Sequence, residues 1–276
     1  MKSILAIADG GPALDMTIAA GGLIAGLFQA RLDVLHVRDP LALGGAMAVA
    51  AMAEAPGQIV FEENRAKEGL RAGLAKQAFT ALSAGLGDAH FSDVEGSEDV
   101  VVPARGRLAD LIVIGRPGAD EMKPEPHHAR AAIFDCARPV LIVAPGWKPK
   151  GLGHAVVAWN GSAQSARALG YALPLLHRFG KVTVLSAGSK DGRAPTDSVL
   201  RYLALHGLKA AAVEVDGGAG SARARGRTML QHVEKLGADL LVMGAYGQPA
   251  VMRFLGLGGA TAKVITACKV PVFLAH

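Results

Sequence analysis

Short runs of consecutive apolar residues alternate along the chain with longer amphipathic segments. The apolar runs predict strands near residues 3–8, 32–38, 89–94, 110–115, 139–144, 154–159, 181–187, 210–215, 239–244 and 270–275. The amphipathic segments predict helices near 12–29, 60–86, 97–107, 127–136, 163–178, 195–206, 221–236 and 259–267. Uninterrupted apolar strands that alternate with helices are typical of parallel sheets covered on both faces. The pattern therefore predicts an α/β fold built from open, doubly wound sheets.

The same order of apolar and polar blocks occurs twice. Residues 4–11 resemble residues 155–162, since both are apolar runs that end in a polar residue and Gly. Three more pairs follow in the same order: 32–37 with 182–187, 109–115 with 238–244, and 136–144 with 268–276. Such self-similarity indicates an internal repeat. With the Pro- and Gly-containing segment 145–151 as a linker, we predict two five-stranded parallel-sheet domains, residues 1–146 and 153–276. The stretch 39–60 exceeds a standard connection, and we expect a mobile loop or an extra helix there.

The composition agrees with two α/β cores and argues against other classes. Of the 276 residues, 51% are hydrophobic and 19% charged, and 35 glycines accompany few aromatic residues. The two cysteines fit a reducing compartment rather than a disulfide framework. The apolar run Leu41–Ala53 is too short to span a bilayer, and Asp9 and Asp15 do not fit a signal peptide. We expect a soluble, cytoplasmic protein that has no membrane partner.

The charge is moderately basic, with a formal net value of +5. A basic balance can indicate nucleic acid or acidic lipid as a partner, but no long Lys/Arg run with interleaved aromatic residues is present. The densest cluster is Arg223, Arg225 and Arg227. We interpret it as a solvated helix face, with contact to an anionic partner as the alternative. Nucleic acid is not an expected ligand.

The candidate chemistry lies in the second half, where loops follow the first and fourth strands of the repeat. Ligands of open α/β sheets bind beyond the carboxyl ends of strands, where the strand order reverses. Asn160 can bind a sugar hydroxyl, and Thr261 can cap a helix or bind phosphate. Glycines allow close backbone approach and positive φ, and a helix amino terminus attracts anions. The candidate residues from these loops are Asn160, Gly161, Ser162, Gly244, Gly247, Gly258, Gly259 and Thr261.

The same residues also fit a purely structural role. Glycine is common wherever a strand turns into a helix, and Asn-Gly-Ser is an ordinary turn followed by a helix N-cap. Spacing alone leaves the nucleotide site and the structural turn as open alternatives.

The whole chain resembles a tandem universal stress protein. The resemblance rests on Ala158-Trp-Asn-Gly-Ser162, the Met243-Gly244-x-x-Gly247 turn, the downstream Gly-Gly-x-Thr261 and the terminal Cys268-x-x-Pro-Val. It implies the strand order 3-2-1-4-5 in each domain, a stress-response role and, in one subgroup, ATP held by a Gly-x2-Gly-x9-Gly-Ser/Thr loop. Magnesium can accompany that ATP. By the same resemblance Val184 lines the adenine pocket and Met243 flanks it, and Ala158 is a further nucleotide-binding candidate.

The sequence departs from this family pattern at three points. Ten residues, not nine, separate Gly247 from Gly258, and Gly259 stands where the pattern has Ser or Thr. Asn160 replaces the acid that many relatives carry after the first strand, which weakens any metal-coordinating role there.

The equivalent loop in the first half lacks the glycines. When the halves are aligned through Cys136 and Cys268, Pro126 and His127 stand where the second half has Gly258 and Gly259. Acidic residues in this loop repel phosphate; they are Asp120, Glu121 and Glu125. Although Asp9-Gly10-Gly11 keeps the first turn, we predict that the nucleotide site of this half is degenerate.

No catalytic group and no metal site are predicted. The chain has no nucleophile elbow, no Walker A sequence and no plausible carboxylate pair, so slow ATP hydrolysis is the most activity we expect. His127 and His128 are adjacent on a helix, point in different directions and do not suit one ion. The equivalent positions of Cys136 and Cys268 indicate packing rather than redox chemistry. Asp110 and Asp239 begin equivalent strands, away from the ligand edge, and are interpreted as structural.

Two functions remain open at this point. In the first, the protein is a regulator that binds ATP or a similar adenine nucleotide in its second domain and transmits occupancy to a protein partner of unknown identity. In the second, it is an interaction protein without nucleotide that acts through dimerisation. The resemblance implies that the last strand often pairs across a dimer. A tandem chain could instead pair residues 139–144 with 270–275 internally, and a homodimer could still form.

Overall fold

The computed structural model describes residues 1–38, 57–118, 127–149, 151–186, 195–215, 221–245 and 259–276. Contacts divide the chain into two compact units, Met1–Arg138 and Pro139–His276. This division places the strand that follows residue 139 with the second unit. The domain limits predicted from the repeat, 1–146 and 153–276, follow sequence similarity rather than contacts and stay a prediction.

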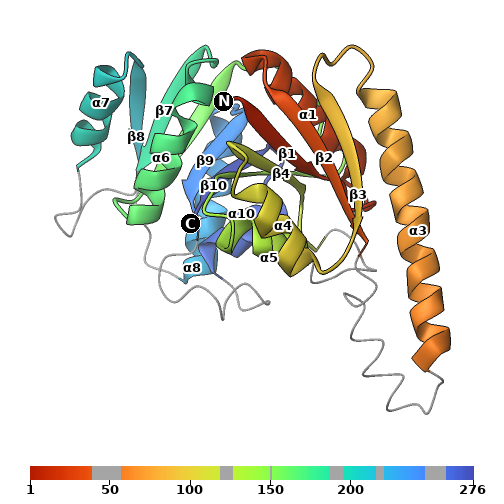
Figure 1. The fold of residues 1–276 in the computed structure, drawn as a ribbon. Coiled ribbons are helices and arrows are strands. Elements are labelled where there is room, and N and C mark those ends of the chain that lie inside the picture. The colour runs from red at the N-terminus through yellow and green to blue at the C-terminus, as the bar shows by residue number, and fades with distance from the viewer. Residues whose placement is uncertain (39–56, 119–126, 150, 187–194, 216–220, 246–258) are drawn as a thin grey trace. The chain divides into compact units, whose positions relative to one another are not determined.

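The first unit holds four parallel strands of the ten-stranded sheet of the described residues, with helices on both faces (Figure 1). Its strands are β1 (Ser3–Ile7), β2 (Arg31–Arg38), β3 (Ala89–Glu95) and β4 (Leu111–Gly115). They lie in the order β3-β2-β1-β4, and every pairing among them is parallel. The centre of the sheet is apolar: β4 is buried throughout its length, and four of the five residues of β1 are buried. Burial of such runs on both faces is the reason that they lack polar alternation.

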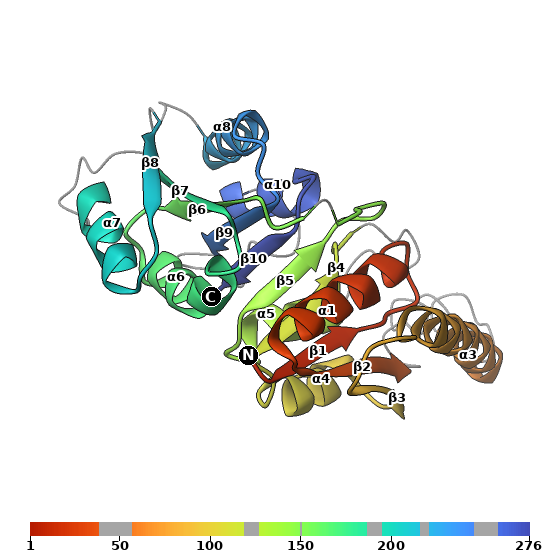
Figure 2. The same cartoon turned by 90° about the horizontal axis from the view of Figure 1, so that it is seen from above.

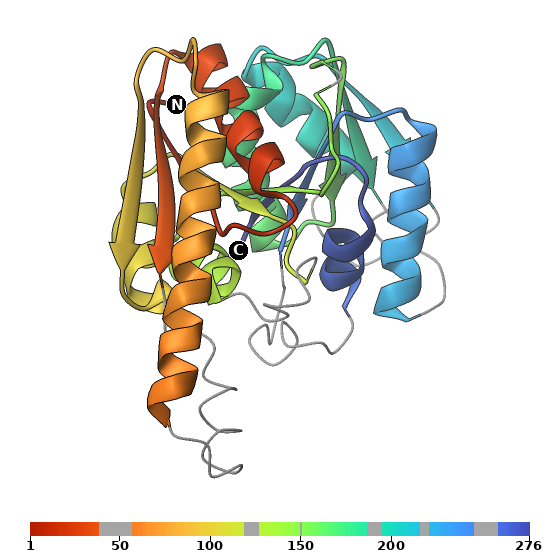
Figure 3. The same ribbon diagram turned by 90° about the vertical axis from the view of Figure 1, so that its right-hand side faces the viewer.

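Four helices in the described part of this unit cover its strands: α1 (Leu14–Phe28), α3 (Gly57–Leu82), α4 (Glu98–Gly106) and α5 (His127–Phe134). Helix α3 packs against α1 and β2, and α4 packs against α5, so each pair covers one face. Figure 3 shows that the amino-terminal turns of α3 continue beyond the carboxyl ends of β2 and β3. Residues 57–60 belong to α3, whereas the rest of the long stretch 39–60 lies outside the described residues.

The second unit holds the strands in the order β5-β10-β9-β6-β7-β8, which belong to the ten-stranded sheet of the described residues. Its strands are β5 (Val140–Val143), β6 (His154–Trp159), β7 (Lys181–Ser186), β8 (Ala210–Glu214), β9 (Leu240–Gly244) and β10 (Val272–Ala275). All neighbours are parallel except β5 and β10, which are antiparallel. In repeat numbering, the second half therefore has the predicted order 3-2-1-4-5.

Helices again form two layers around this sheet. They are α6 (Ala163–Leu176), α7 (Thr196–Leu205), α8 (Ala222–Lys235) and α10 (Ala260–Ala267). Figure 2 shows α6 and α7 on one face and α8 with α10 on the other. The contacts agree, because α8 packs on α10 while α6 packs on β9 and β10. The predicted α/β fold with mostly parallel strands is thus confirmed.

The fifth strand of the first repeat keeps the predicted place in the strand order, β3-β2-β1-β4-β5, although contacts assign it to unit 2. Unit 1 holds only the 3-2-1-4 part of the order, and β5 lies in unit 2, paired with β10. Ile142 opposes Val272 and Val140 opposes Leu274, as the internal pairing of 139–144 with 270–275 predicts. Phe273 in this pair is fully buried. Because β5 occupies the β10 edge, that edge is not free to pair with a second chain.

Two aspartates tie together the amino ends of equivalent strands. Asp110 accepts hydrogen bonds from the backbone N–H groups of Lys2 and Ser3. Asp239 accepts them from Gly153 and His154, each at 3.0 Å. The hydrogen bond from Lys2, with a smaller one from Ser3, lowers the pKa of Asp110 despite its partial burial. Both aspartates lie at the edge of their sheet opposite to the predicted ligand edge and are structural, as predicted.

None of the helices in the described ranges combines the length and the apolar character that a membrane crossing requires.

Candidate functional site

A cavity of about 200 Å³ opens at the carboxyl ends of β6 and β9 in the second unit. Four of the residues expected at a ligand site line it: Ala158, Asn160, Met243 and Gly244. Strands β6 and β9 are adjacent, with Ala158 opposite Met243. This is the point where the chain crosses from one side of the sheet to the other, and a parallel sheet of this type places its ligand there. The cavity is smaller than the 300–1,000 Å³ of typical ligand pockets.

The loop after β6 is a tight turn that begins helix α6. The Asn160 side-chain oxygen accepts a hydrogen bond from the Ser162 N–H at 3.1 Å, and Gly161 has φ +70°. The Ser162 hydroxyl accepts from the Ser165 N–H and caps the helix. The structural interpretation of Asn-Gly-Ser is therefore correct for the turn and the cap. Asn160 nevertheless remains exposed at the rim of the cavity.

Gly244 has a different role from the predicted one. Its φ is not positive, and a Cβ at this position would lie 2.5 Å from the Ser165 backbone N and 2.7 Å from the Gln164 carbonyl carbon. Glycine is thus required because β9 packs directly on the first turn of α6. Gly244 also lines the cavity. The same residue therefore packs against helix α6 and forms part of the cavity wall.

Replacing Gly244 by Ala is expected to lower the free energy of unfolding by about 2 kcal/mol, because overpacking against rigid backbone forces a shift. Gly170→Ala is the matched control, since a Cβ there meets nothing within 4 Å inside helix α6. The control should stabilise the protein by roughly 0.5–1 kcal/mol through helix propensity. Urea unfolding of both variants measures the difference. Equal behaviour of the two would contradict the packing role of Gly244.

Several predicted site residues lie elsewhere or outside the described ranges. Val184 is fully buried and is not part of the cavity lining, which takes its neighbour Leu185 instead. Leu185 lies one residue nearer the carboxyl end of β7, at the edge of the sheet where the cavity opens. Thr261 does not cap α10, because the helix begins at Ala260 and Gly259 is its N-cap. Gly247 and Gly258 fall in the segment 246–258, outside the described residues.

The amino terminus of α10 lies beside this cavity, whose lining includes Ala260. The N-cap Gly259 is extended, with φ −104° and ψ 175°, and as a glycine it has no side chain that could cap the helix. A Cβ on Gly259 would meet no atom within 4 Å. A helix amino terminus of this kind presents N–H groups and partial positive charge to the space in front of it.

Helix α8 supplies a wall of the cavity that the sequence did not predict. Arg225, Thr228 and Met229 line it, and the other unpredicted lining residues are Trp159, Leu185, Val215 and Ala260. Arg225 belongs to the cluster that was interpreted as a solvated face, and it is exposed but placed at the cavity. Residues 225, 228 and 229 are spaced so that they lie on one face of a helix. This spacing is the feature of the sequence that could have predicted a shared wall.

In the first unit, a side chain covers the equivalent turn. Asp9 accepts a hydrogen bond from Gly11 at 3.0 Å and Gly10 has φ +72°, so the turn matches that of Asn160 and Gly161. Arg71 of α3 packs directly over it: a Cβ on Gly10 would lie 2.7 Å from the Arg71 Cβ. The Arg71 guanidinium also donates to the Asp9 carbonyl at 2.9 Å. The β1 turn of this half thus lies beneath helix α3.

A carboxylate occupies the amino terminus of α5, the counterpart of α10. Glu98, which is 3% exposed, accepts a hydrogen bond from the His128 backbone N–H at 2.7 Å. The same oxygen lies 3.2 Å from His128 Nδ1, and His128 Nε2 lies 3.7 Å from Asp9. In the alignment through the cysteines, His128 stands at the position of Ala260. Where the second half has a glycine without a side chain, the first half places a carboxyl group at the helix amino terminus.

The histidines and the cysteine of the first half that were weighed as metal or redox candidates make structural contacts in the part of the chain that is described. His127 is half-exposed and bonds Asp99, whereas His128 is buried, and the described residues contain no group of three or more side chains suited to a metal ion. Burial raises the pKa of Cys136 to about 11, so its thiol stays protonated at neutral pH. Asp120, Glu121, Glu125 and Pro126 lie outside the described ranges.

Comparisons with solved structures identify the fold of the whole chain. A universal stress protein from Archaeoglobus fulgidus DSM 4304 superposes with a TM-score of 0.71 at 19% identity, over 99% of this chain and 95% of that one. A functionally unknown protein from Pseudomonas aeruginosa PAO1 gives a TM-score of 0.58 at 15% identity, over 100% and 92% of the two chains. At these identities the likeness concerns the fold. No curated protein matches the sequence.

The sequence comparison applies to the second half, where the candidate cavity lies. Residues 152–276 match the model of the universal stress protein family, and this range includes every predicted site residue of the second half. Residues 152–276 are thus similar to the universal stress protein family, within a chain whose fold resembles that of a solved universal stress protein.

Proposed function

We propose that the second half of this protein binds an adenine nucleotide, ATP with or without magnesium, and that occupancy regulates a protein partner in a stress response. The observation that carries the proposal is the junction of the cavity with the amino terminus of α10. Ala158 and Met243 offer apolar walls for a base, Asn160 offers an amide for a sugar, and Gly259 opens the helix terminus to phosphate.

The charge on α8 supports a phosphorylated ligand. Arg225 lines the cavity, and a guanidinium binds phosphate oxygens in a planar, often bidentate geometry. Arg223 lies on the same helix but does not line the cavity. The base would therefore lie toward the β6 and β9 ends and the phosphates toward α8 and α10.

The contrast between the halves supports one site per chain. In the first half Glu98 takes the position before α5, and Arg71 covers the first turn. A nucleotide phosphate placed there would meet a buried carboxylate, and repulsion between like charges in a poorly solvated site is large. The first half then serves as a partner-docking or structural domain.

The alternative function is an interaction protein without nucleotide, acting through dimerisation. The β5–β10 pairing disfavours dimerisation through the last strand, since the chain itself covers that edge. A homodimer would have to use another surface, and this places the nucleotide proposal first. A cytoplasmic location is part of the same proposal, and enzymatic turnover is not.

Arg225→Ala is expected to weaken ATP binding about tenfold while changing adenosine binding less than twofold, because the guanidinium acts on the phosphates. Arg223→Ala is the matched control from the same helix and should change neither by more than twofold. Competition against a fluorescent adenine nucleotide measures all four values. Equal weakening of ATP and adenosine by Arg225→Ala, or no weakening of ATP, would contradict the phosphate role of Arg225. Absence of any binding to the wild-type chain would overturn the proposed function itself.

A further inference from the structure

A second cavity, of about 520 Å³, opens at the opposite edge of the same sheet. It lies at the amino ends of β9 and β10, where Asp239 and Val270 line it, whereas the candidate nucleotide cavity is at the carboxyl ends. Its volume falls within the range of typical small-molecule pockets. All of its lining residues belong to the second unit. The proposed nucleotide site does not use this cavity.

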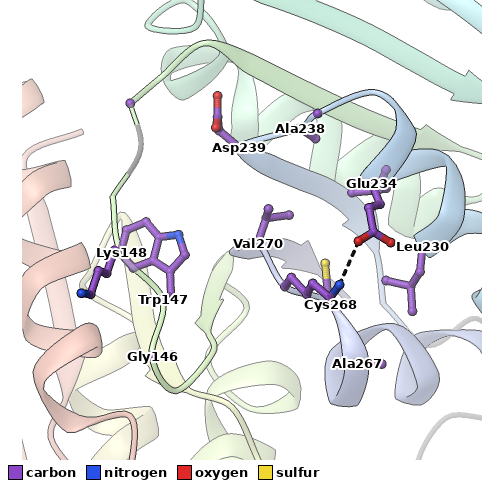
Figure 4. A pocket seen from close by; sticks show the side chains of 14 residues that line it. Gly146, Trp147, Lys148, Leu230, Glu234, Ala238, Asp239, Ala267, Cys268 and Val270 are labelled. Atoms are coloured by element: carbon purple, nitrogen blue, oxygen red, sulfur yellow. Dashed lines mark hydrogen bonds and ion pairs between the residues drawn. The ribbon is translucent and has the colours of Figure 1, made fainter.

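One wall of this cavity is the indole of Trp147. The residue follows β5 in a turn closed by a hydrogen bond from the Trp147 N–H to the Ala144 carbonyl, with Gly146 at φ +72°. Strand β5 is buried and paired with β10, so the turn is anchored on the sheet. Figure 4 shows the Trp147 side chain on the side of the cavity across from Leu230 and Glu234. A part-buried tryptophan held in this way offers an aromatic ring at the wall of the cavity.

The opposite wall is formed by the carboxyl ends of two helices. The last turn of α8 contributes Val233 and Glu234, and the last turn of α10 contributes Ala267 and Cys268. Helix carboxyl termini carry partial negative charge and point carbonyl oxygens outward. Two such ends at one cavity favour a cationic ligand over an anionic one.

The side-chain charges around the cavity reinforce this preference. Glu234 and Lys269 form an ion pair at 2.8 Å, so the Lys269 charge is largely cancelled. Asp239 lines another side, and the Lys148 ammonium points away from the cavity (Figure 4). The hydrogen bond from Lys269 lowers the pKa of Glu234, which keeps that carboxylate ionised. The charges that face the space are therefore neutral to negative in sum.

From these features we propose that this cavity binds a small organic cation, an ammonium group attached to an apolar body. The ammonium lies over the Trp147 ring and near the ends of α8 and α10, and the body packs against Leu230, Val233 and Ala267. Attraction between a cation and an indole face, strengthened by partial desolvation, supplies the selectivity. The site is independent of the nucleotide proposal because the two cavities share no residue.

The test uses benzyltrimethylammonium as the probe and benzoate as a ring-bearing anion of similar size. Trp147 and Trp159 are the two tryptophans of the chain, so Trp159→Phe leaves Trp147 as the reporter of fluorescence. We expect saturable quenching by the ammonium probe and at least tenfold weaker binding of benzoate. Equal or tighter binding of benzoate, or no saturation by the ammonium probe, would overturn the proposal.

Variants in the wild-type chain, measured by calorimetry, locate the site. Trp147→Leu should weaken binding of the ammonium probe about tenfold, whereas Trp159→Leu, at the other edge of the sheet, should leave it within twofold. Lys269→Met should tighten binding severalfold because it leaves the Glu234 charge unpaired, and Glu234→Gln should weaken it severalfold. Tighter binding in Lys269→Met together with weaker binding in Glu234→Gln supports a cation site. Shifts in the reverse sense, or an unchanged affinity in Trp147→Leu, would contradict it.

Discussion

Gly259→Asp is expected to weaken ATP binding about a hundredfold, which is close to 2.7 kcal/mol. The substitution places a carboxylate at the N-cap of α10, where the proposed phosphate lies. It reproduces in the second half what Glu98 does at α5 in the first. Two like charges about 4 Å apart near a protein surface repel by several kcal/mol. The lost affinity is a charge effect, because the backbone at Gly259 is extended and a Cβ there meets no atom within 4 Å.

Gly259→Asn is the matched control for the Asp variant. Asn has the same shape and caps a helix comparably well, but it is neutral. We expect an affinity within about threefold of wild type for Asn, and for both variants an unchanged or slightly raised melting temperature. Direct competition titrations with ATP measure the two affinities. Equal losses in Asp and Asn would show that shape rather than charge is responsible, and wild-type affinity in the Asp variant would show that phosphate does not lie at α10.

Glu98→Ala is expected to lower the free energy of unfolding by about 3 kcal/mol. Glu98 is 3% exposed and accepts the His128 N–H at the start of α5. Removal of the carboxyl group takes away the acceptor of that amide and the neighbour of His128 Nδ1, on the same imidazole whose Nε2 lies 3.7 Å from Asp9. Loss of one partner from a buried charged network costs several times more than loss of a surface contact. Glu98→Gln keeps an acceptor for the amide and should lose less than half as much.

Asp99→Ala is the control, because Asp99 is the next residue of α4 and makes exposed contacts. It pairs with Arg130 at 2.7 Å and with His127 at 3.1 Å. Exposed pairs of this kind contribute about 0–1 kcal/mol. Urea unfolding at neutral pH measures both losses. A Glu98→Ala loss no larger than that of Asp99→Ala would contradict the role of Glu98 as the internal anion of this half.

Much of the fold could be predicted because it depends on local patterns. The strand expected at 154–159 is β6, His154–Trp159, and the helix expected at 221–236 is α8, Ala222–Lys235, with Ser221 as its cap. Apolar runs, turn glycines and capping residues carry this information within a few positions of one another. The internal repeat, through the family resemblance that it supports, predicted the strand order 3-2-1-4-5. The structure has this order in the second half.

The remainder depends on contacts between distant segments. Glu98 meets α5 thirty residues later in the chain, and no spacing rule marks that pair. Gly244 was assigned to ligand approach, although its glycine is required by the Gln164 and Ser165 backbone of α6. The periodicity of α8 indicated one helix face at Arg225 but not what that face would meet. Such features follow from how elements pack, which local pattern does not specify.

Calorimetric titration of ATP with magnesium into the full wild-type chain tests most directly the claim that one half binds nucleotide while the other carries its own anion. We predict one site per chain, with the heat abolished in Gly259→Asp and retained in Gly259→Asn. Two sites per chain would contradict the role assigned to Glu98 and Arg71. No heat from a folded protein would contradict the nucleotide site in the second half.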